Sequence, residues 1–403
     1  MNQTADVIIV GGGVTGLLTA IHLKVLGVDK VTVLERYHVG SGQSHRAAGI
    51  VRALVRHPLV ARALAESIAF VKDFEQRFDD PILYHPSGYL LLTDLEQADA
   101  VNDSISAAAK AGCEARQIDA VEAQELQRGL REDDETLYVY EPGAIHLDPM
   151  PAVQAMARVA KRLGVKVIEG CEVGDILTHG GKVTGIESAQ GRFEAPTTLI
   201  ATSVWGAAQL ARLGIEVPVY PHRAEMAFFH VPTTDDFRLS RIVSDARSML
   251  YLRPEGDRQM FVGWREGDRV HGVDDMDDEE PDHYKQTADF ERLAAMQRRL
   301  AVTLPPMDNG FVHRTYACVY DYTPDGMPVL DRADSVDGLY FALGFSGGGF
   351  SISPWVGRSM AQFIVDRKTP SQIEPFELKR FAEGKLIRWA NVGKSASTEV
   401  DSD

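Results

Sequence analysis

The chain has 403 residues, of which 44% are hydrophobic and 25% charged, as in a typical soluble globular protein large enough for two domains. Its 42 basic and 58 acidic side chains give a formal net charge of −16, which disfavours nucleic acid or an anionic membrane surface as a partner. The three cysteines, Cys113, Cys171 and Cys318, are widely spaced and match neither a disulfide framework nor a zinc site. We therefore expect a cytoplasmic protein without a metal.

The N-terminus predicts a strand, a glycine-rich turn, a helix and a second strand. DVIIV (6–10) is a compact β-branched run, as in a strand buried on both faces. GGGVTG follows at once, then a helical pattern that stops at Gly27, then the apolar run VTVLE (31–35). No basic segment precedes the first run, so it does not resemble a signal peptide, and no stretch is long enough to span a bilayer.

Each part of this unit has a physical role in binding a dinucleotide. Gly11 allows a tight turn, Gly13 lets a pyrophosphate approach the backbone, and Gly16 lets the helix pack against the strand. The helix N-terminus attracts phosphates, and Glu35 can accept hydrogen bonds from ribose hydroxyls. An acid at this position disfavours the 2′-phosphate of NADP, which leaves FAD or NAD.

Two further segments favour FAD over NAD. GSGQSHRAAGIVR (40–52) is rich in small residues, which suits a chain passing a large planar ring, whereas an NAD enzyme would continue with another strand and helix. Near the other terminus, 338–366 reads as a strand, a glycine loop and a helix. Its Gly347, Gly348 and Gly349 would bring backbone N–H groups and a second helix N-terminus to the same ligand, unless they serve only as a glycine-rich helix entry.

Six motifs occur in order along nearly the whole chain: GGGVTG, GSGQSHRAAGIVR, HPSGYLLLTD (85–94), TTLIATSVWGAAQLARLG (197–214), TPDGMPVLD (323–331) and GFSGGGF (344–350). Together they resemble the D-amino-acid-oxidase-like superfamily of FAD enzymes, in particular its sarcosine oxidase and glycine oxidase branch. The fold class that this resemblance implies is α/β, or α+β overall. It would combine a Rossmann-like, discontinuous FAD-binding domain with a second, antiparallel-sheet substrate domain.

The implied FAD-binding domain comprises residues 1–85, 145–215 and 310–390, and the substrate domain comprises 86–144 and 216–309. Alternating runs at 224–231 and 249–254 would form the antiparallel sheet that roofs the flavin, and 171–188 fits a hairpin turning at Gly180 and Gly181. The small polar tail, 393–403, is expected to be disordered.

The resemblance also implies a substrate site. Arg52 falls where the branch places an arginine that holds the substrate carboxylate, although a surface or phosphate contact is the alternative. Tyr251 and Tyr320 match tyrosines that line the pocket, but tyrosines on strands are also common in cores. Ser351 replaces a second, carboxylate-binding lysine of the family.

Cofactor contacts are implied at further positions besides the glycines and Glu35. These are Val14, Thr15, Arg36, Ser44, His45, Arg46, Val173, Thr202, Cys318 and Phe350. In sarcosine-oxidase-like enzymes a cysteine at the position of Cys318 is bonded through sulfur to the flavin 8α-methyl group. Because a thiolate is the nucleophile, we expect His45 or Arg46 to lower the pKa of Cys318; an inert buried cysteine beside non-covalent FAD is the alternative.

The expected activity is FAD-dependent oxidation of the C–N bond of a small amino acid, whether a secondary, N-methyl or primary amine. Hydride transfer to flavin N5 would give an imine that hydrolyses in water. One alternative is a flavin dehydrogenase of a 2-hydroxy acid, with His45, His222 or His313 as base. Another is the flavin-bearing, beta-type subunit of a multi-chain amine dehydrogenase.

The electron acceptor is expected to be O₂ or an electron-accepting partner protein. Phe261 stands where the family's oxidases place an oxygen-activating lysine, and an apolar ring cannot stabilise a forming superoxide. The acidic run DDMDDEEPD (274–282) is either a solvated loop or a docking patch for a basic redox partner.

Overall fold

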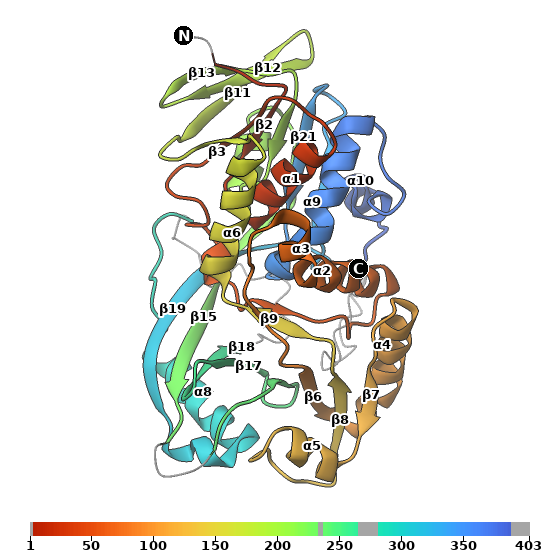
Figure 1. Cartoon of the computed structure of the whole chain (residues 1–403), viewed down its shortest axis with the longest axis vertical. Helices are drawn as coiled ribbons and strands as arrows, with labels where there is room; N and C mark the ends of the chain where they lie inside the picture. Colours follow the sequence, from red (N-terminus) through yellow and green to blue (C-terminus); the bar gives the residue numbers. More distant parts are fainter. Residues whose placement is uncertain (1–2, 233–236, 265–280, 388–403) are drawn as a thin grey trace, which may run out of the picture.

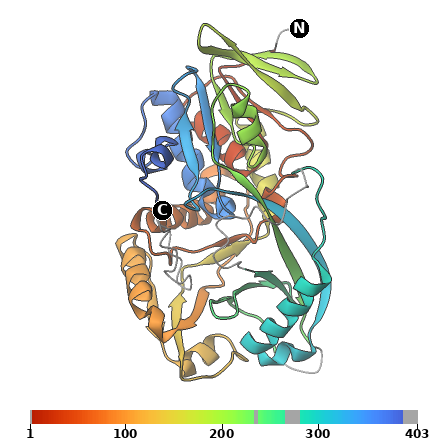
Figure 2. The ribbon, with the colours of Figure 1, turned by 180° about the vertical axis from the view of Figure 1, so that it is seen from behind.

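The computed structural model describes residues 3–232, 237–264 and 281–387, so the tail 393–403 and most of the acidic run lie outside the described residues. One large sheet lies in the upper half of the views and another in the lower half (Figure 1, Figure 2). The mixed α/β fold class is confirmed. Among the described residues, no helix combines the length and apolar character that a membrane span requires.

The upper half is built on a six-stranded sheet. Its strands run in the order β10 (Lys166–Ile168), β3 (Val31–Leu34), β2 (Val7–Val10), β14 (Thr198–Ile200), β21 (Leu339–Leu343) and β20 (Val329–Arg332). All neighbours pair in parallel except β20 with β21. Every residue of β2, β3, β14 and β21 is buried, because both faces of a parallel sheet are covered.

Strand alternation divides the core of this half into two layers. Val7 and Ile9 of β2 pack with the helices on one face, whereas Ile8 and Val10 pack on the other face. The helices are α1 (Val14–Val25), α2 (Pro58–Lys72), α3 (Phe74–Phe78), α6 (Pro149–Arg162) and α9 (Gly349–Asp366). The opposite face carries α7 (Trp205–Ala211) and a four-stranded sheet of β1 (Gln3–Thr4), β13 (Gly191–Glu194), β12 (Lys182–Ser188) and β11 (Val173–His179).

The hairpin expected at 171–188 is confirmed. Strands β11 and β12 pair antiparallel, and the turn between them consists of Gly180 and Gly181 with φ of +58° and +74°. Two consecutive residues in the left-handed region define the tight hairpin turn that glycine permits at no steric cost.

The lower half is built on an eight-stranded sheet, which confirms the antiparallel sheet expected from 224–231 and 249–254. Its order is β19 (Phe311–Tyr322), β15 (Tyr220–His230), β18 (Gln259–Trp264), β17 (Leu250–Glu255), β16 (Ile242–Asp245), β6 (Tyr89–Asp94), β8 (Thr136–Glu141) and β7 (Arg116–Ile118). All neighbours are antiparallel except β16 with β6. Strand β19 belongs to this sheet, although its residues fall in the segment 310–390 expected for the FAD-binding domain; the domain boundaries stay a prediction.

The smaller elements connect and cover the two halves. Strands β4 (Ile50–Val51), β9 (Ile145–Leu147) and β5 (Tyr84–His85) form a three-stranded sheet between the large ones (Figure 1). In the lower half, α8 (Phe290–Thr303) covers one face of the eight-stranded sheet. The remaining helices are α4 (Ala98–Lys110), α5 (Ala120–Leu126), α10 (Lys379–Ala382) and the short 3₁₀ turns Ser44–Arg46, Leu95–Gln97, Pro305–Asn309 and Glu374–Phe376.

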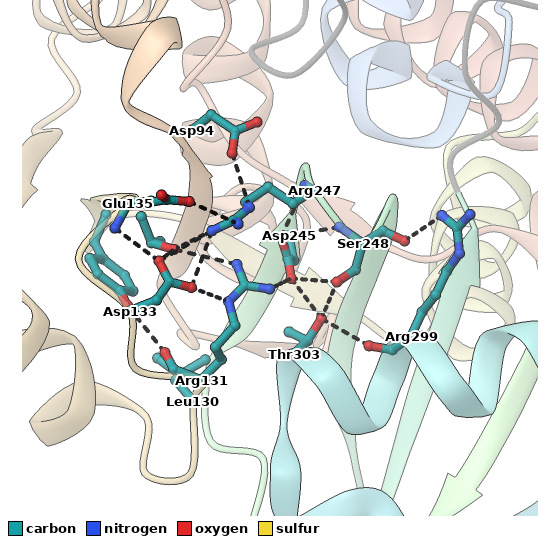
Figure 3. Close-up of polar contacts among 12 residues, drawn as sticks. Asp94, Leu130, Arg131, Asp133, Glu135, Asp245, Arg247, Ser248, Arg299 and Thr303 are labelled. Carbon is teal, nitrogen blue, oxygen red and sulfur yellow. Dashed lines mark hydrogen bonds and ion pairs between the residues drawn. The ribbon is translucent and has the colours of Figure 1, made fainter.

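A buried carboxylate fixes the turn between β16 and β17 (Figure 3). Asp245, with no exposed surface, accepts hydrogen bonds from Ser248 Oγ at 2.6 Å and Thr303 Oγ1 at 2.7 Å, and it pairs with Arg131 Nη1 at 3.3 Å. Its other oxygen accepts the backbone N–H of Arg247 at 3.0 Å. Because strand β17 starts directly after this turn, the network also sets where Tyr251 lies.

Replacing Asp245 with alanine is expected to lower the free energy of unfolding by about 3–5 kcal/mol, because Arg131 and two hydroxyls lose a buried partner. The measurement is urea unfolding followed by circular dichroism. Asp94, whose half-exposed side chain pairs with Arg247 at 2.9 Å, is the matched control. Asp94→Ala should cost less than about 1 kcal/mol, and equal costs for the two variants would contradict the assignment.

Candidate active site

Helices α1 and α9 begin side by side. Thr15 Oγ1 and Ser353 Oγ, both buried, are hydrogen-bonded at 2.8 Å, and Ser353 Oγ also donates to the Gly349 carbonyl at 2.6 Å. Both N-cap residues are glycines, Gly13 and Gly348, and within the described structure neither helix has an acidic residue in its first turn. Two positive helix ends therefore converge, and this arrangement suits the phosphates and the electron-rich ring edge of a dinucleotide.

The three glycines of the N-terminal motif have the geometry that the motif predicts. Gly11 has φ of +109°, and a Cβ there would lie 2.4 Å from the Ala201 carbonyl oxygen. A Cβ on Gly16 would lie 2.0 Å from the Gly11 carbonyl oxygen. A Cβ on Gly13 would approach only Ser44 Oγ, at 3.0 Å, among the described atoms. Gly13 thus leaves open the place where a pyrophosphate would lie, and the residues fit the expected FAD.

Glu35 follows β3 and lies against the glycine turn. Its carboxylate accepts the backbone N–H groups of Gly12 at 2.8 Å and Tyr37 at 3.0 Å. Ser44 Oγ accepts the N–H of Val14 at 3.0 Å, so the segment after β3 also contacts the start of α1. These contacts fix the acid beside the glycine turn, and its binding of a ribose stays a prediction.

Arg36, which follows Glu35, is paired with an acid that sequence reasoning did not place here. Its Nη1 lies 2.9 Å from Asp282 Oδ2, and its guanidinium lies 5.0 Å from the Trp205 ring. The Trp205 indole N–H donates to Asp282 at 3.0 Å, and the hydrogen bond from Arg36 lowers the pKa of Asp282. Asp282 is the last residue of the acidic run 274–282. This end of the run binds Arg36 and Trp205.

The segment 40–46 is internally braced. Arg46 Nη1 donates to the carbonyls of Ser41 and Gly42 at 2.9 and 3.0 Å, and His45 Nδ1 lies 2.9 Å from the Gly40 carbonyl oxygen. Burial, and then the charge of Arg46, lowers the pKa of His45. His45 is therefore a neutral imidazole at physiological pH.

Strand β19 is tied to this segment by two contacts that sequence reasoning missed. The Tyr316 hydroxyl donates to the Arg46 carbonyl at 2.9 Å, and the Val319 N–H donates to Gln43 Oε1 at 3.1 Å. Neither residue belongs to a recognisable motif, and the pairing of segments about 270 residues apart has no local sequence signal.

One face of the eight-stranded sheet is aromatic and looks toward the cofactor half. By strand alternation Cys318 and Tyr320 of β19 lie on the same face, and Phe261 and Tyr251 join Cys318 in one apolar cluster. The Tyr320 ring lies against Gly347, whose Cβ would be 3.1 Å from it. Burial, and then the neighbouring Tyr251, raises the pKa of Tyr320, which is therefore a neutral phenol.

Tyr251 lies flat over Gly263, its partner on β18. A Cβ on Gly263 would lie 2.1 Å from Cζ of the tyrosine, and the Tyr251 ring centre is 5.8 Å from that of Phe261. The missing side chain of Gly263 thus makes room for the tyrosine. The structure brings Tyr251, Tyr320 and Cys318 together with the glycine loop before α9.

Arg46 acts to lower the pKa of Cys318, as expected, but the net shift of that pKa is upward. Burial raises the pKa of the thiol to about 12, although Tyr320 and Arg46 act in the opposite direction. His45 is not among the groups that act on the thiol. Desolvation outweighs the charge because Cys318 is enclosed between Ala224 on the next strand and the surrounding rings.

Arg52 follows β4 and reaches the sheet next to this face. Its guanidinium lies 4.7 Å from the centre of the Tyr89 ring and donates to the Leu54 carbonyl. Ser351 lies in the first turn of α9 and donates to the Gly348 carbonyl at 2.8 Å, so its hydroxyl is engaged within its own helix.

The other expected residues take varied places. Val173 starts β11, Phe350 packs at the edge of the helical core, and Thr202 Oγ1 donates to Gln209 Oε1 at 2.8 Å. Of the histidines considered as bases, His313 is exposed on β19, while buried His222 packs against Tyr322 at 5.0 Å between ring centres.

Asp321 is a further buried acid that sequence reasoning missed. It lies on β19 and accepts the backbone N–H of Gly344 at 2.9 Å, which fixes the start of the glycine loop. Burial raises the pKa of Asp321 to about 6. The alternation of side chains along β19 predicts that Asp321 lies on the other face of the sheet from Tyr320. Only the tertiary structure shows that its carboxylate accepts the backbone N–H of Gly344.

The chain is similar to known FAD-dependent enzymes over most of its length. The family described as FAD dependent oxidoreductase matches residues 6–363. The chain is 25% identical to the sarcosine oxidase subunit beta of Arthrobacter sp., covering 96% of this chain and 93% of that protein. It is also 25% identical to the glycine oxidase of Geobacillus kaustophilus, covering 94% and 98%. It spans only 42% of human mitochondrial sarcosine dehydrogenase, to which it is 24% identical.

Solved structures show the same fold. The crystal structure of L-proline dehydrogenase from P. horikoshii superposes with a TM-score of 0.86 at 25% identity, covering 96% of this chain and 100% of that one. Glycine oxidase from Geobacillus kaustophilus superposes with a TM-score of 0.79 at 24% identity, covering 94% and 99%.

Gly13→Ala is expected to weaken FAD binding at least about tenfold, because the new methyl group occupies the approach of the pyrophosphate. Among the described atoms Ser44 Oγ is the one close neighbour, and it need shift only slightly, so the unfolding transition of the cofactor-free protein should change little. Titration of apoprotein with FAD, followed by flavin fluorescence, measures the affinity.

Gly143→Ala is the matched control, since a Cβ at Gly143 meets no described atom within 4 Å. It should bind FAD as the wild type does. Unchanged affinity of the Gly13 variant would show that the glycine turn does not bind the pyrophosphate.

Proposed function

The chain belongs to the FAD dependent oxidoreductase family, and we propose that it oxidises the C–N bond of a small amino acid, whether a secondary, N-methyl or primary amine. Its cofactor is FAD, which when bound supplies N5 as the acceptor of the hydride equivalent. The imine product hydrolyses in water without a dedicated base.

The observation that carries the proposal is the joint position of a guanidinium and an aromatic wall. Arg52 lies over the Tyr89 ring, Tyr320 lies against Gly347 of the glycine loop, and Tyr251 belongs to the same apolar cluster as Tyr320. A guanidinium binds a planar carboxylate through two parallel hydrogen bonds. With the carboxylate held by Arg52, the two tyrosine side chains would line the rest of the substrate site.

Two of the three candidate histidines support an amine over a 2-hydroxy acid as substrate. A hydroxy acid needs a base to remove the hydroxyl proton, whereas a neutral amine already has its lone pair. His45 is engaged with the Gly40 carbonyl, His222 packs on Tyr322, and His313 is exposed. His222, however, is the cross-strand partner of Tyr320, so the reaction with a hydroxy acid is also a test of this histidine.

The names of the relatives support the same reaction class. Sarcosine, glycine and L-proline, which are named for those proteins, are all small amino acids with a secondary or primary amine. One of the relatives is a subunit, and the position of the oxygen-activating lysine holds the fully buried Phe261. We therefore propose an electron-accepting partner protein, rather than fast reaction with O₂, as the second half of the cycle.

The test is anaerobic bleaching of the bound flavin. Sarcosine, glycine or L-proline is expected to reduce it, and lactate is not. Arg52→Ala should raise the KM of the active amino acid about 10- to 100-fold, the loss expected for one charge-assisted pair. Arg56, four residues on and half-exposed in an ion pair with Asp103, is the matched control, and Arg56→Ala should leave the KM unchanged. Reduction by lactate alone would overturn the amine assignment.

FAD is expected to be bound without a covalent link to Cys318. A thiol with a pKa of about 12 is almost entirely protonated at neutral pH, and the thiolate is the form that attacks carbon. After acid precipitation, flavin should be found in the supernatant for both wild type and Cys318→Ala. Flavin that stays in the wild-type pellet and leaves that of Cys318→Ala would show covalent attachment.

A further inference from the structure

A buried carboxylate lies directly behind Arg52. Glu141, the last residue of β8, has no exposed surface and pairs with Tyr89 across β6 and β8. Its Oε1 accepts the N–H of Ala53 and its Oε2 the N–H of Leu54, each at 2.8 Å. The carboxylate therefore accepts hydrogen bonds from the backbone N–H groups of the two residues that immediately follow Arg52.

The same cross-strand pair holds both ends of the arginine. Glu141 fixes the backbone after Arg52, while Tyr89, its neighbour on β6, lies under the guanidinium at 4.7 Å. Apolar residues on this face include Leu54, Leu91 and Val139. Burying an acid among such residues costs free energy unless hydrogen bonds compensate for its lost hydration.

Each of the two consecutive N–H donors has its own acceptor oxygen on Glu141. A carboxylate offers one oxygen to each, whereas a glutamine side chain would offer one oxygen and point an N–H₂ group at the second donor. Burial raises the pKa of Glu141, and the two backbone hydrogen bonds, followed by the charges of Arg52 and Lys72, act against this rise. Arg52 and Glu141 thus interact electrostatically as well as through the backbone.

We propose that Glu141 is a positioning residue that sets the place of Arg52 and thereby the binding of a substrate carboxylate. The inference rests on the proposed role of Arg52. Glu141 has no exposed surface from which to contact a ligand, so its effect should be confined to ligands that carry a carboxylate.

The experiment titrates the oxidised holoenzyme with acetate and, separately, with acetamide, following the flavin absorption spectrum. Glu141→Gln is expected to weaken acetate binding at least tenfold without changing the weak acetamide binding or the affinity for FAD. In steady-state assays the KM of the active amino acid should rise by a similar factor, and kcat should change less than threefold. Glu135 is exposed and directly precedes the strand β8 that ends in Glu141. Glu135→Gln is therefore the control and should match the wild type.

A double-variant comparison separates positioning from a general structural role. In an Arg52→Ala background, Glu141→Gln should cause no further loss of acetate affinity, because the arginine that it positions is gone. Additive losses would overturn the inference. If Arg52→Ala leaves acetate affinity unchanged, the proposed function fails; if it weakens acetate binding and Glu141→Gln does not, only this inference fails.

Glu141→Asp serves if the glutamine variant does not yield soluble holoenzyme. It keeps both oxygens on a shorter side chain, so the backbone after Arg52 must shift and acetate should bind at least threefold more weakly. Acetate affinity equal to that of the wild type would overturn the inference.

Discussion

The close packing of α1 on α9 is the constraint on which the cofactor half depends. A Cβ on Gly357 of α9 would lie 2.7 Å from Leu18 Cβ of α1, so the helices cross where α9 has no side chain. The hydrogen bond between Thr15 and Ser353 then holds the N-termini of α1 and α9 beside each other. Because β2 leads into α1 and β21 leads into α9, this contact also fixes the two glycine loops relative to each other.

The eight-stranded sheet makes the complementary contribution. Period-two alternation gives it one apolar face that packs on α8 and another that carries Cys318, Phe261 and the tyrosines. A shift of one residue in any strand would exchange the two faces. Asp245 and Gly263 each remove such freedom near Tyr251, the first by holding the turn and the second by leaving space for the ring.

Much of this fold could be predicted from sequence because the signals are local. The glycine turn at 11–16, the hairpin at Gly180 and Gly181, and the alternation of 224–231 each depend on neighbouring residues alone. The contacts that brace the site do not: Glu141 meets Ala53, and Asp321 meets Gly344, only after distant strands have paired. The high pKa of Cys318 could not be predicted for a related reason. The sequence identifies nearby cations but not how completely a thiol is enclosed.

The discontinuity of the cofactor half has a consequence for biosynthesis. Helix α9 and its strand β21 are the last large elements along the chain, whereas β2 and α1 are among the first. A ribosome-bound nascent chain therefore carries a glycine turn without the second helix that completes it, until almost the whole protein has been translated. All eight strands of the lower sheet, together with α1, α2, α3, α6 and α7 of the upper half, emerge before β21, so coenzyme capture comes as a closing event of folding rather than as its seed.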